Sequence, residues 1–133
     1  MTDNCACNVI EIGGGLACTT ETCLMRRLDP DTLESREKID LSGLVNIASG
    51  RSLTDPKSKK VYNLSGTFLT GLKYHFISFP PSDVVLSQKE LLASASIVAT
   101  IPSRMTTCFS YYHTFGMTEN YLVMIEQPWV ANR

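Results

Sequence analysis

The residues with the clearest potential for chemistry lie in the segment 111–121, around His113. This segment is predicted to end one strand, turn at Gly116 and enter another strand. A neutral imidazole can bind a metal ion through one ring nitrogen while a carboxylate accepts a hydrogen bond from the other nitrogen. Glu21, at the end of its own predicted strand, is a candidate for that carboxylate. A histidine in a strand is more often a core residue with satisfied hydrogen bonds, so the residue types alone leave both roles open.

Other familiar catalytic arrangements are weaker or missing. Cys108 and His113 are conceivable as a nucleophile pair, but five residues apart on one strand their side chains would point to opposite faces. The consecutive glycines at 13–15 precede neither a helix nor a Lys-Ser/Thr pair, so they predict a turn rather than a phosphate-binding loop. The sequence contains no Gly-x-Ser-x-Gly nucleophile elbow.

The five cysteines do not predict a zinc site. An odd number of cysteines in a chain without a signal peptide is typical of free thiols in a reducing compartment. Cys5-x-Cys7 and Cys18-x4-Cys23 lack the paired short spacings of structural zinc, and the two histidines are 38 positions apart. We therefore interpret the cysteines as small apolar residues in strands.

Charge and hydropathy exclude other classes of function. The 133 residues include 12 Lys and Arg and 13 Asp and Glu, so the chain has no excess of basic residues. This balance argues against a nucleic-acid partner, because a phosphate-binding surface needs a basic excess. The dense run at Lys57, Lys59 and Lys60 is explained by a solvated loop. No apolar stretch approaches the roughly 20 residues of a transmembrane helix, and the N-terminus is too polar for a signal peptide. We expect an intracellular, cytoplasmic chain, with mitochondrial or membrane-peripheral locations left open.

The pattern of short runs between turn signals predicts an all-β chain, with residues 1–133 forming one unit. A sandwich, a barrel and a propeller remain open. Residues 87–95 favour a short helix capped by Ser87, although 82–99 is also compatible with a loop and a strand. The predicted strands are 8–12, 16–22, 23–28, 38–41, 60–64, 72–79, 96–101, 108–113 and 120–126.

The run 112–123, continuing through Glu126-Gln127-Pro128, resembles the animal carotenoid cleavage oxygenases. That family includes the β-carotene oxygenases and the retinoid isomerohydrolase of the visual cycle. The similarity continues upstream and covers nearly the whole chain in the family's order. The upstream motifs are Thr2-Asp3-Asn4 with Asn8-Val9, and the runs 17–22, 28–34, 54–56 and 61–63.

The resemblance implies a fragment, about two blades, of a seven-bladed β-propeller whose parent proteins are several times longer. In that family four histidines near the axis hold a non-haem ferrous iron, which activates dioxygen for oxidative cleavage of a carotenoid or retinoid double bond. His113 matches one of those ligands. Glu21 matches the glutamate that accepts a hydrogen bond from that ligand, which agrees with the pairing suggested by chemistry.

The sequence departs from the family pattern at the first iron-binding histidine. With Asp55-Pro56 aligned, Arg51 stands where that ligand is expected, and a guanidinium has no lone pair to donate. His75 matches no family ligand and is predicted to be a strand residue, and the other two ligands would lie beyond Arg133. With one ligand of four, we expect the isolated chain to be metal-poor, inactive and prone to aggregation at exposed sheet edges.

Three interpretations follow from these residues. The chain is part of a carotenoid or retinoid oxygenase, or a non-catalytic apolar-ligand binding or interaction protein with a degenerate iron site, or a truncated product with no function of its own. Arg51 motivates the second interpretation. The aromatic residues Tyr111, Tyr112, Phe115 and Trp129 fit either a lipid-facing tunnel or packing between blades, and packing is the commoner role.

Overall fold

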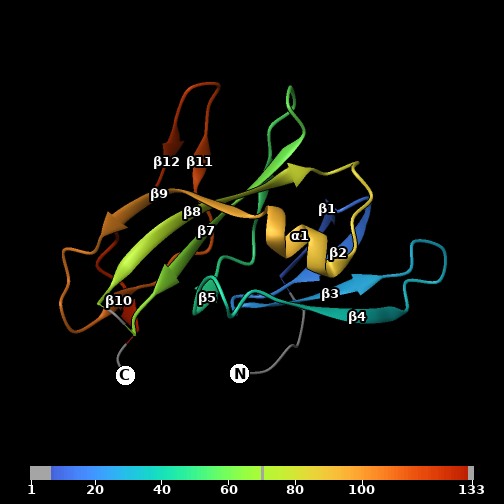
Figure 1. Cartoon of the computed structure of the whole chain (residues 1–133). Helices are drawn as coiled ribbons and strands as arrows, with labels where there is room; N and C mark the ends of the chain where they lie inside the picture. The colour runs from blue at the N-terminus through green and yellow to red at the C-terminus, as the bar shows by residue number, and fades with distance from the viewer. Residues whose placement is uncertain (1–6, 70, 132–133) are drawn as a thin grey trace.

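The computed structural model describes residues 7–69 and 71–131, which are built almost entirely from antiparallel β-sheet (Figure 1). Thr2, Asp3, Asn4 and Cys5, which the sequence analysis used, lie outside the described residues. Within the described ranges, no helix is long and apolar enough to cross a membrane. The all-β class and the antiparallel hairpins predicted from the sequence are confirmed.

The N-terminal sheet has four strands in sequence order, each antiparallel to the next. They are β1 (Asn8–Ile12), β2 (Gly15–Thr19), β3 (Leu24–Leu28) and β4 (Ser35–Asp40). Gly13 and Gly14 form the β1–β2 turn at φ values of 59° and 69°, which glycine adopts without steric cost. The glycine run therefore makes the hairpin turn that the sequence predicts.

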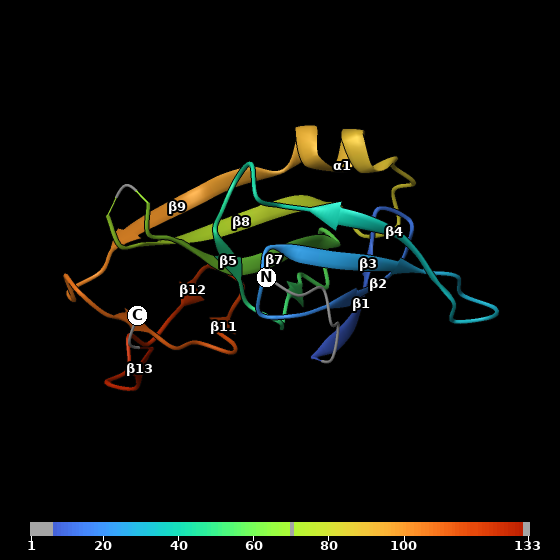
Figure 2. The ribbon, with the colours of Figure 1, turned by 90° about the horizontal axis from the view of Figure 1, so that it is seen from below.

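The central sheet has the order β5–β7–β8–β9. A further short strand, β6, pairs with the first part of β7, whereas β5 pairs with the last part of β7. Its long strands are β7 (Lys60–Thr67), β8 (Lys73–Pro81) and β9 (Ser96–Pro102), and its short ones are β5 (Ile47–Ala48) and β6 (Leu53–Thr54). Figure 2 shows β9 at the outer edge of this sheet. Along the chain, the loop after β4 separates the N-terminal sheet from the central sheet.

Two apolar clusters hold the sheets together. The main core joins residues of both sheets and of the helix, so each sheet buries one face against the other. Its members are Ile10, Ile12, Ala17, Cys23, Leu24, Met25, Ile39, Leu41, Val45, Ala48, Val61, Ile77, Phe79 and Leu91. The second core joins the central sheet to the C-terminal segment, and its buried members are Leu64, Tyr74, Phe76, Tyr112 and Phe115.

Polar contacts fix the β1–β2 turn against the loop that follows β8. The Gly14 amide donates to the Ser82 carbonyl over 2.8 Å, and the Leu86 amide donates to the Gly13 carbonyl over 3.2 Å. From β3, the Arg27 guanidinium donates to the Leu86 carbonyl over 2.8 Å. These bonds give partners to main-chain groups at this contact, where Gly13 and Ser82 are buried.

One short helix, α1 (Gln88–Ser94), links β8 to β9 within the described residues. Ser87 caps it: the Glu90 amide donates to Ser87 Oγ over 3.3 Å, and the Ser87 amide donates to Glu90 Oε2 over 2.9 Å. The helix favoured at 87–95 is therefore confirmed. Several predicted strand bounds were wrong. The strand β2 ends at Thr19, so Glu21 lies beyond it, and β4 begins earlier, at Ser35. The strands β7 and β8 continue through Thr67 and Pro81.

The C-terminal segment contains only two-residue strand pairs. β10 (Phe109–Ser110) pairs with β13 (Val130–Ala131), and β11 (Gly116–Met117) pairs with β12 (Leu122–Val123). The predicted continuous strands 108–113 and 120–126 were therefore wrong. Tyr112 and Phe115 instead pack onto Tyr74 and Phe76, so aromatic burial sets the path of this segment.

His75 lies in β8 and is buried, as the sequence predicts for a strand residue. Its Nε2 lies 2.9 Å from Thr67 Oγ1 and its Nδ1 lies 2.9 Å from Thr100 Oγ1. Both ring nitrogens therefore have hydroxyl partners on the neighbouring strands β7 and β9. His75 is a core histidine with satisfied hydrogen bonds.

A substitution at Gly66 tests how the C-terminal segment packs on β7. A Cβ at this position would overlap the ring of Phe109, which lies 4.9 Å from the ring of Tyr74. We expect Gly66→Ala to lower the free energy of unfolding by about 1–3 kcal/mol, because the ring must move out of its packed position. Gly43→Ala is the matched control, since a Cβ there meets no atom within 4 Å. Equal urea midpoints for the two variants would contradict this packing.

His75 also predicts a dependence of stability on pH. Burial, with a smaller contribution from the charge of Lys73, lowers the pKa of His75 below its ordinary value. Below about pH 6.5 the unfolded chain therefore gains a proton that the folded chain does not, and the free energy of unfolding falls as the pH falls. His75→Gln removes this titration, so its urea midpoint should change less between pH 7.5 and pH 5.5 than that of the unaltered chain. Parallel pH profiles would contradict the assignment.

Candidate functional site

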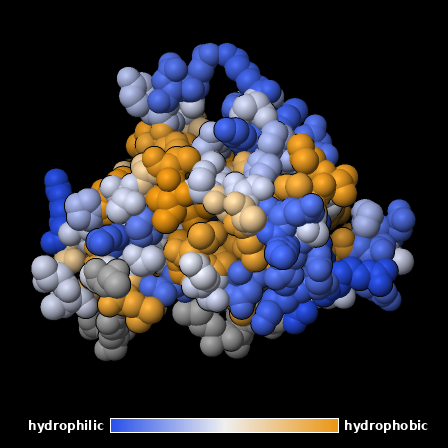
Figure 3. Space-filling model, in the orientation of Figure 1, coloured by the Kyte–Doolittle hydropathy of each residue, from blue (hydrophilic) through white to orange (hydrophobic). Residues whose placement is uncertain are grey.

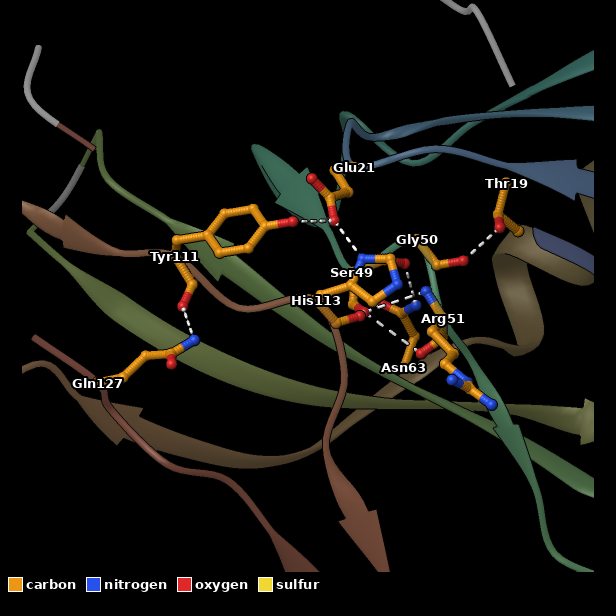
Figure 4. A network of polar contacts seen from close by, with 9 residues as sticks. All are labelled: Thr19, Glu21, Ser49, Gly50, Arg51, Asn63, Tyr111, His113 and Gln127. Atoms are coloured by element: carbon orange, nitrogen blue, oxygen red, sulfur yellow. Dashed lines mark hydrogen bonds and ion pairs between the residues drawn. The ribbon is translucent and has the colours of Figure 1, made fainter. Parts of the chain in front are cut away.

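The candidate site centres on a contact between Glu21 and His113. Glu21 lies in the loop between β2 and β3, and His113 lies between β10 and β11. The His113 Nδ1 and Glu21 Oε1 atoms are 2.5 Å apart, although the residues are 92 positions apart in the chain (Figure 4). The structure therefore brings together the two side chains that the sequence singles out.

Among the described residues, only Nδ1 of the His113 ring has a hydrogen-bond partner. When Nδ1 donates its proton to Glu21, Nε2 of the neutral ring carries the lone pair. The His113 and Glu21 side chains are 46% and 32% exposed, so a ligand can reach the ring. Solvent screening at this exposure limits the contribution of the pair to stability to about 1 kcal/mol or less.

Tyr111 makes a second contact with the same carboxylate oxygen. Its hydroxyl donates to Glu21 Oε1 over 2.7 Å. This hydrogen bond to a negatively charged acceptor, together with partial burial, raises the pKa of Tyr111 to about 12. The sequence analysis considered Tyr111 only as an apolar ring and missed its hydrogen bond. The Tyr-x-His spacing, which places Tyr111 close to His113 along the chain, is the available signal.

The main chain at His113 is held by a loop of the central sheet. Ser49 Oγ donates to the His113 carbonyl, and the Arg51 amide donates to Ser49 Oγ over 3.1 Å. The buried Asn63 amide group of β7 donates to the Ser49 carbonyl over 2.8 Å and to Ser52 Oγ over 3.0 Å. This polar network fixes the 49–52 loop against the segment that carries His113 (Figure 4).

Arg51 lies on that loop, and its side chain is exposed. In Figure 4 the guanidinium points away from Glu21 and the ring of His113. The neighbouring Gly50 has no room for a side chain, because a Cβ there would lie 2.6 Å from the Cys7 Cβ and 3.4 Å from the Glu21 Cγ. The loop therefore approaches the site closely through its backbone, while its charged side chain leaves the site.

The described residues do not form a complete metal site. Within the part of the chain that the structure describes, no group of three or more His, Cys, Asp or Glu side chains is placed to hold a metal ion. His113 offers a single ring nitrogen, and Arg51 offers no lone pair. Weakly binding divalent ions such as ferrous iron need several ligands to replace their water. The donor set of this segment therefore does not fit ferrous iron by itself.

Other sequence candidates lie outside this contact. The partner of His113 Nδ1 is Glu21 rather than Cys108. The sequence analysis placed Cys108 and His113 on opposite faces of one strand, but residues 108–113 do not form a single strand. Tyr112 and Phe115 are buried in the second core, which supports a packing role. The Trp129 ring lies 5.3 Å from the ring of Tyr111 and is 71% exposed.

Comparison with known proteins identifies relatives along the whole chain. The family model described as retinal pigment epithelial membrane protein matches residues 1–133. The β,β-carotene 15,15'-dioxygenase of Gallus gallus is 36% identical over 134 residues, which cover 97% of this chain and 25% of that protein. The mitochondrial carotenoid-cleaving dioxygenase of Mustela putorius furo is 38% identical over 135 residues, covering 99% of this chain and 24% of that protein. The β,β-carotene 15,15'-dioxygenase of Rattus norvegicus is 38% identical over 136 residues, covering 97% and 24%.

The chain spans about a quarter of the length of these curated relatives. The match includes the segment of His113 and the loop of Glu21, which the structure places in contact. The chain belongs to the retinal pigment epithelial membrane protein family, the carotenoid oxygenase family that its sequence motifs indicate.

Proposed function

We propose that this chain is a segment of a carotenoid or retinoid cleavage oxygenase that supplies one iron ligand and the carboxylate that orients it. The reaction is the oxidative cleavage of a carotenoid double bond by dioxygen at a non-haem ferrous iron in the complete site. The contact between His113 Nδ1 and Glu21 Oε1 carries this proposal, because it joins two matched family positions that are 92 residues apart. The segment corresponds to about two blades of a seven-bladed β-propeller.

The role of Glu21 is to fix the state of the imidazole. A carboxylate that accepts the Nδ1 proton selects one neutral tautomer, orients the ring and raises the basicity of Nε2. The Ser49 hydroxyl fixes the main chain at His113, so the ring has limited freedom to turn. In the proposal, His113 is the ligand and Glu21 is its positioning residue.

Alone, the segment is proposed to be inactive. A single imidazole does not retain ferrous iron at neutral pH, and Arg51 replaces the expected second donor with a permanently charged group. The outer strand β9 also has an exposed edge, with exposed apolar residues Ile97 and Val98, which favours aggregation of the separated segment.

An apolar pocket lies beside the segment of His113, although His113 is not among the residues that line it. This pocket, of about 450 Å³, is lined by residues that include Phe115, Val123 and Ile125. Figure 3 shows hydrophobic side chains reaching the surface on the face of the molecule that it displays. The relatives' names specify β-carotene and carotenoids, and we extend that substrate class, with dioxygen as co-substrate, to the complete protein.

The location is part of the same proposal. We propose a cytoplasmic protein with peripheral membrane contact, because carotenoids and retinoids partition into lipid. The name of the Mustela putorius furo relative specifies mitochondria, which is the alternative compartment.

A second candidate function rests on Arg51. A protein with the same fold and a degenerate iron site would bind a carotenoid or retinoid without cleaving it. The arginine in place of a histidine favours this candidate, because it removes a donor and adds a positive charge near the place of a cation.

The ligand assignment is tested in a full-length protein that contains this segment. His113→Ala should lower the iron retained after purification by at least about tenfold, and Glu21→Gln should lower iron affinity by about 10- to 100-fold. His75→Gln is the control, because His75 is buried in β8 with hydroxyl partners on both nitrogens. Unchanged iron in His113→Ala, measured by elemental mass spectrometry, would overturn the assignment.

Arg51→His in the same protein separates the two candidate functions. If Arg51 has disabled the site, the unaltered protein should bind carotenoid with less than stoichiometric iron and release no aldehyde. The Arg51→His variant should then gain iron, because a second imidazole nitrogen enters the donor set. Stoichiometric iron and cleavage products in the unaltered protein would exclude the binding-only candidate.

A further inference from the structure

Glu21 receives two hydrogen bonds on one oxygen. Tyr111 Oη lies 2.7 Å from Glu21 Oε1, and His113 Nδ1 lies 2.5 Å from the same atom (Figure 4). A carboxylate oxygen has lone pairs for both donors. Tyr111 and His113 are two residues apart in the segment between β10 and β11, and both side chains reach the same carboxylate oxygen.

Tyr111 is itself firmly placed. Its amide donates to the Trp129 carbonyl over 2.8 Å, and its carbonyl accepts from Gln127 Nε2 over 2.8 Å. Its ring lies 5.3 Å from the ring of Trp129. The hydroxyl is therefore presented to Glu21 from a residue whose main chain and ring are both anchored.

Glu21 needs such support because it lies in a loop and its side chain is 32% exposed. A glutamate has several rotatable bonds, and holding it in one orientation costs conformational entropy. One hydrogen bond to His113 leaves the carboxylate free to turn about that contact. A second, fixed donor on the same oxygen removes this freedom.

We propose that Tyr111 is a positioning residue: its hydroxyl holds the Glu21 carboxylate where it accepts the Nδ1 proton of His113, which leaves the Nε2 lone pair free for a ligand. The use of that lone pair rests on the proposed function, whereas the hydrogen-bond relay does not. The 2.7 Å contact from the Tyr111 hydroxyl to Glu21 Oε1 supports this role. Tyr111 thus has a role that its ring alone, in a tunnel or between blades, would not have.

The test reads the tautomer of His113 directly. The chain has two histidines, His75 and His113, so ring ¹⁵N signals are few and His75 is an internal reference. Solid-state ¹⁵N NMR at about pH 8 distinguishes a ring proton on Nδ1 from one on Nε2 without requiring a dilute solution. The unaltered chain should show His113 protonated on Nδ1. Tyr111→Phe should lower the ratio of the Nδ1–H to the Nε2–H form about fivefold or more.

Two comparisons separate a relay through Glu21 from a general effect on structure. Tyr112→Phe is the matched control, because the Tyr112 hydroxyl is buried with no hydrogen-bond partner among the described residues, and the His113 ratio should not change. In a Glu21→Gln background, Tyr111→Phe should have no further effect, because the relay has already lost its middle member. The His75 signals and the amide spectrum should be the same in all variants.

The proposal is overturned if Tyr111→Phe leaves the tautomer ratio unchanged, if Tyr112→Phe shifts it equally, or if the effect persists in the Glu21→Gln background. None of these measurements uses iron or a carotenoid. Failure of the relay would therefore leave the proposed oxygenase function intact. Conversely, failure of iron retention in the full-length protein would leave the relay intact.

Discussion

Two apolar cores together bring the loop of Glu21 and the segment of His113 into contact. The main core packs the N-terminal sheet on the central sheet, and the second core packs the segment of His113 on the central sheet. Ile12 and Ile39 from the N-terminal sheet and Ile77 and Phe79 from the central sheet are almost completely buried in the main core. Full burial of each such side chain contributes about 1.5–3 kcal/mol, whereas the half-exposed Glu21–His113 pair contributes about 1 kcal/mol or less. The site is therefore a consequence of the fold and does little to stabilise it.

The same comparison explains how the polar site is kept in place. The 49–52 loop is held in place by buried hydrogen bonds, which the Asn63 amide group of β7 donates to the Ser49 carbonyl and to Ser52 Oγ. A buried donor that loses its partner costs about 1–3 kcal/mol, more than the exposed pair gains. The Ser49 hydroxyl donates to the His113 carbonyl, so the main chain at His113 is fixed to the central sheet by this hydrogen bond.

Local signals in the sequence predicted local structure well. The glycines at 13–15 predicted the β1–β2 turn, and Ser87 predicted the start of the capped helix. Short runs of β-branched and aromatic residues between turn signals predicted the long strands of the central sheet. The short strands after residue 108 were predicted too long, because their extent depends on which distant segments offer pairing partners. Glu21 and His113 were paired from chemistry and family resemblance, but Tyr111 required the three-dimensional path of the segment, since its acceptor is 90 positions away.

The contacts of Arg51 separate the backbone framework of the candidate site from the side chain at this position. Its amide is bonded to Ser49 Oγ, which is bonded in turn to the His113 carbonyl, so the backbone at position 51 and at His113 share one hydroxyl. Those bonds use main-chain atoms of residue 51 and do not depend on its side chain. The guanidinium is exposed and makes no contribution to the main core. A histidine at position 51 would therefore enter a framework that is already fixed, and the donor set can change by one side chain while the fold and the Glu21–His113 contact persist.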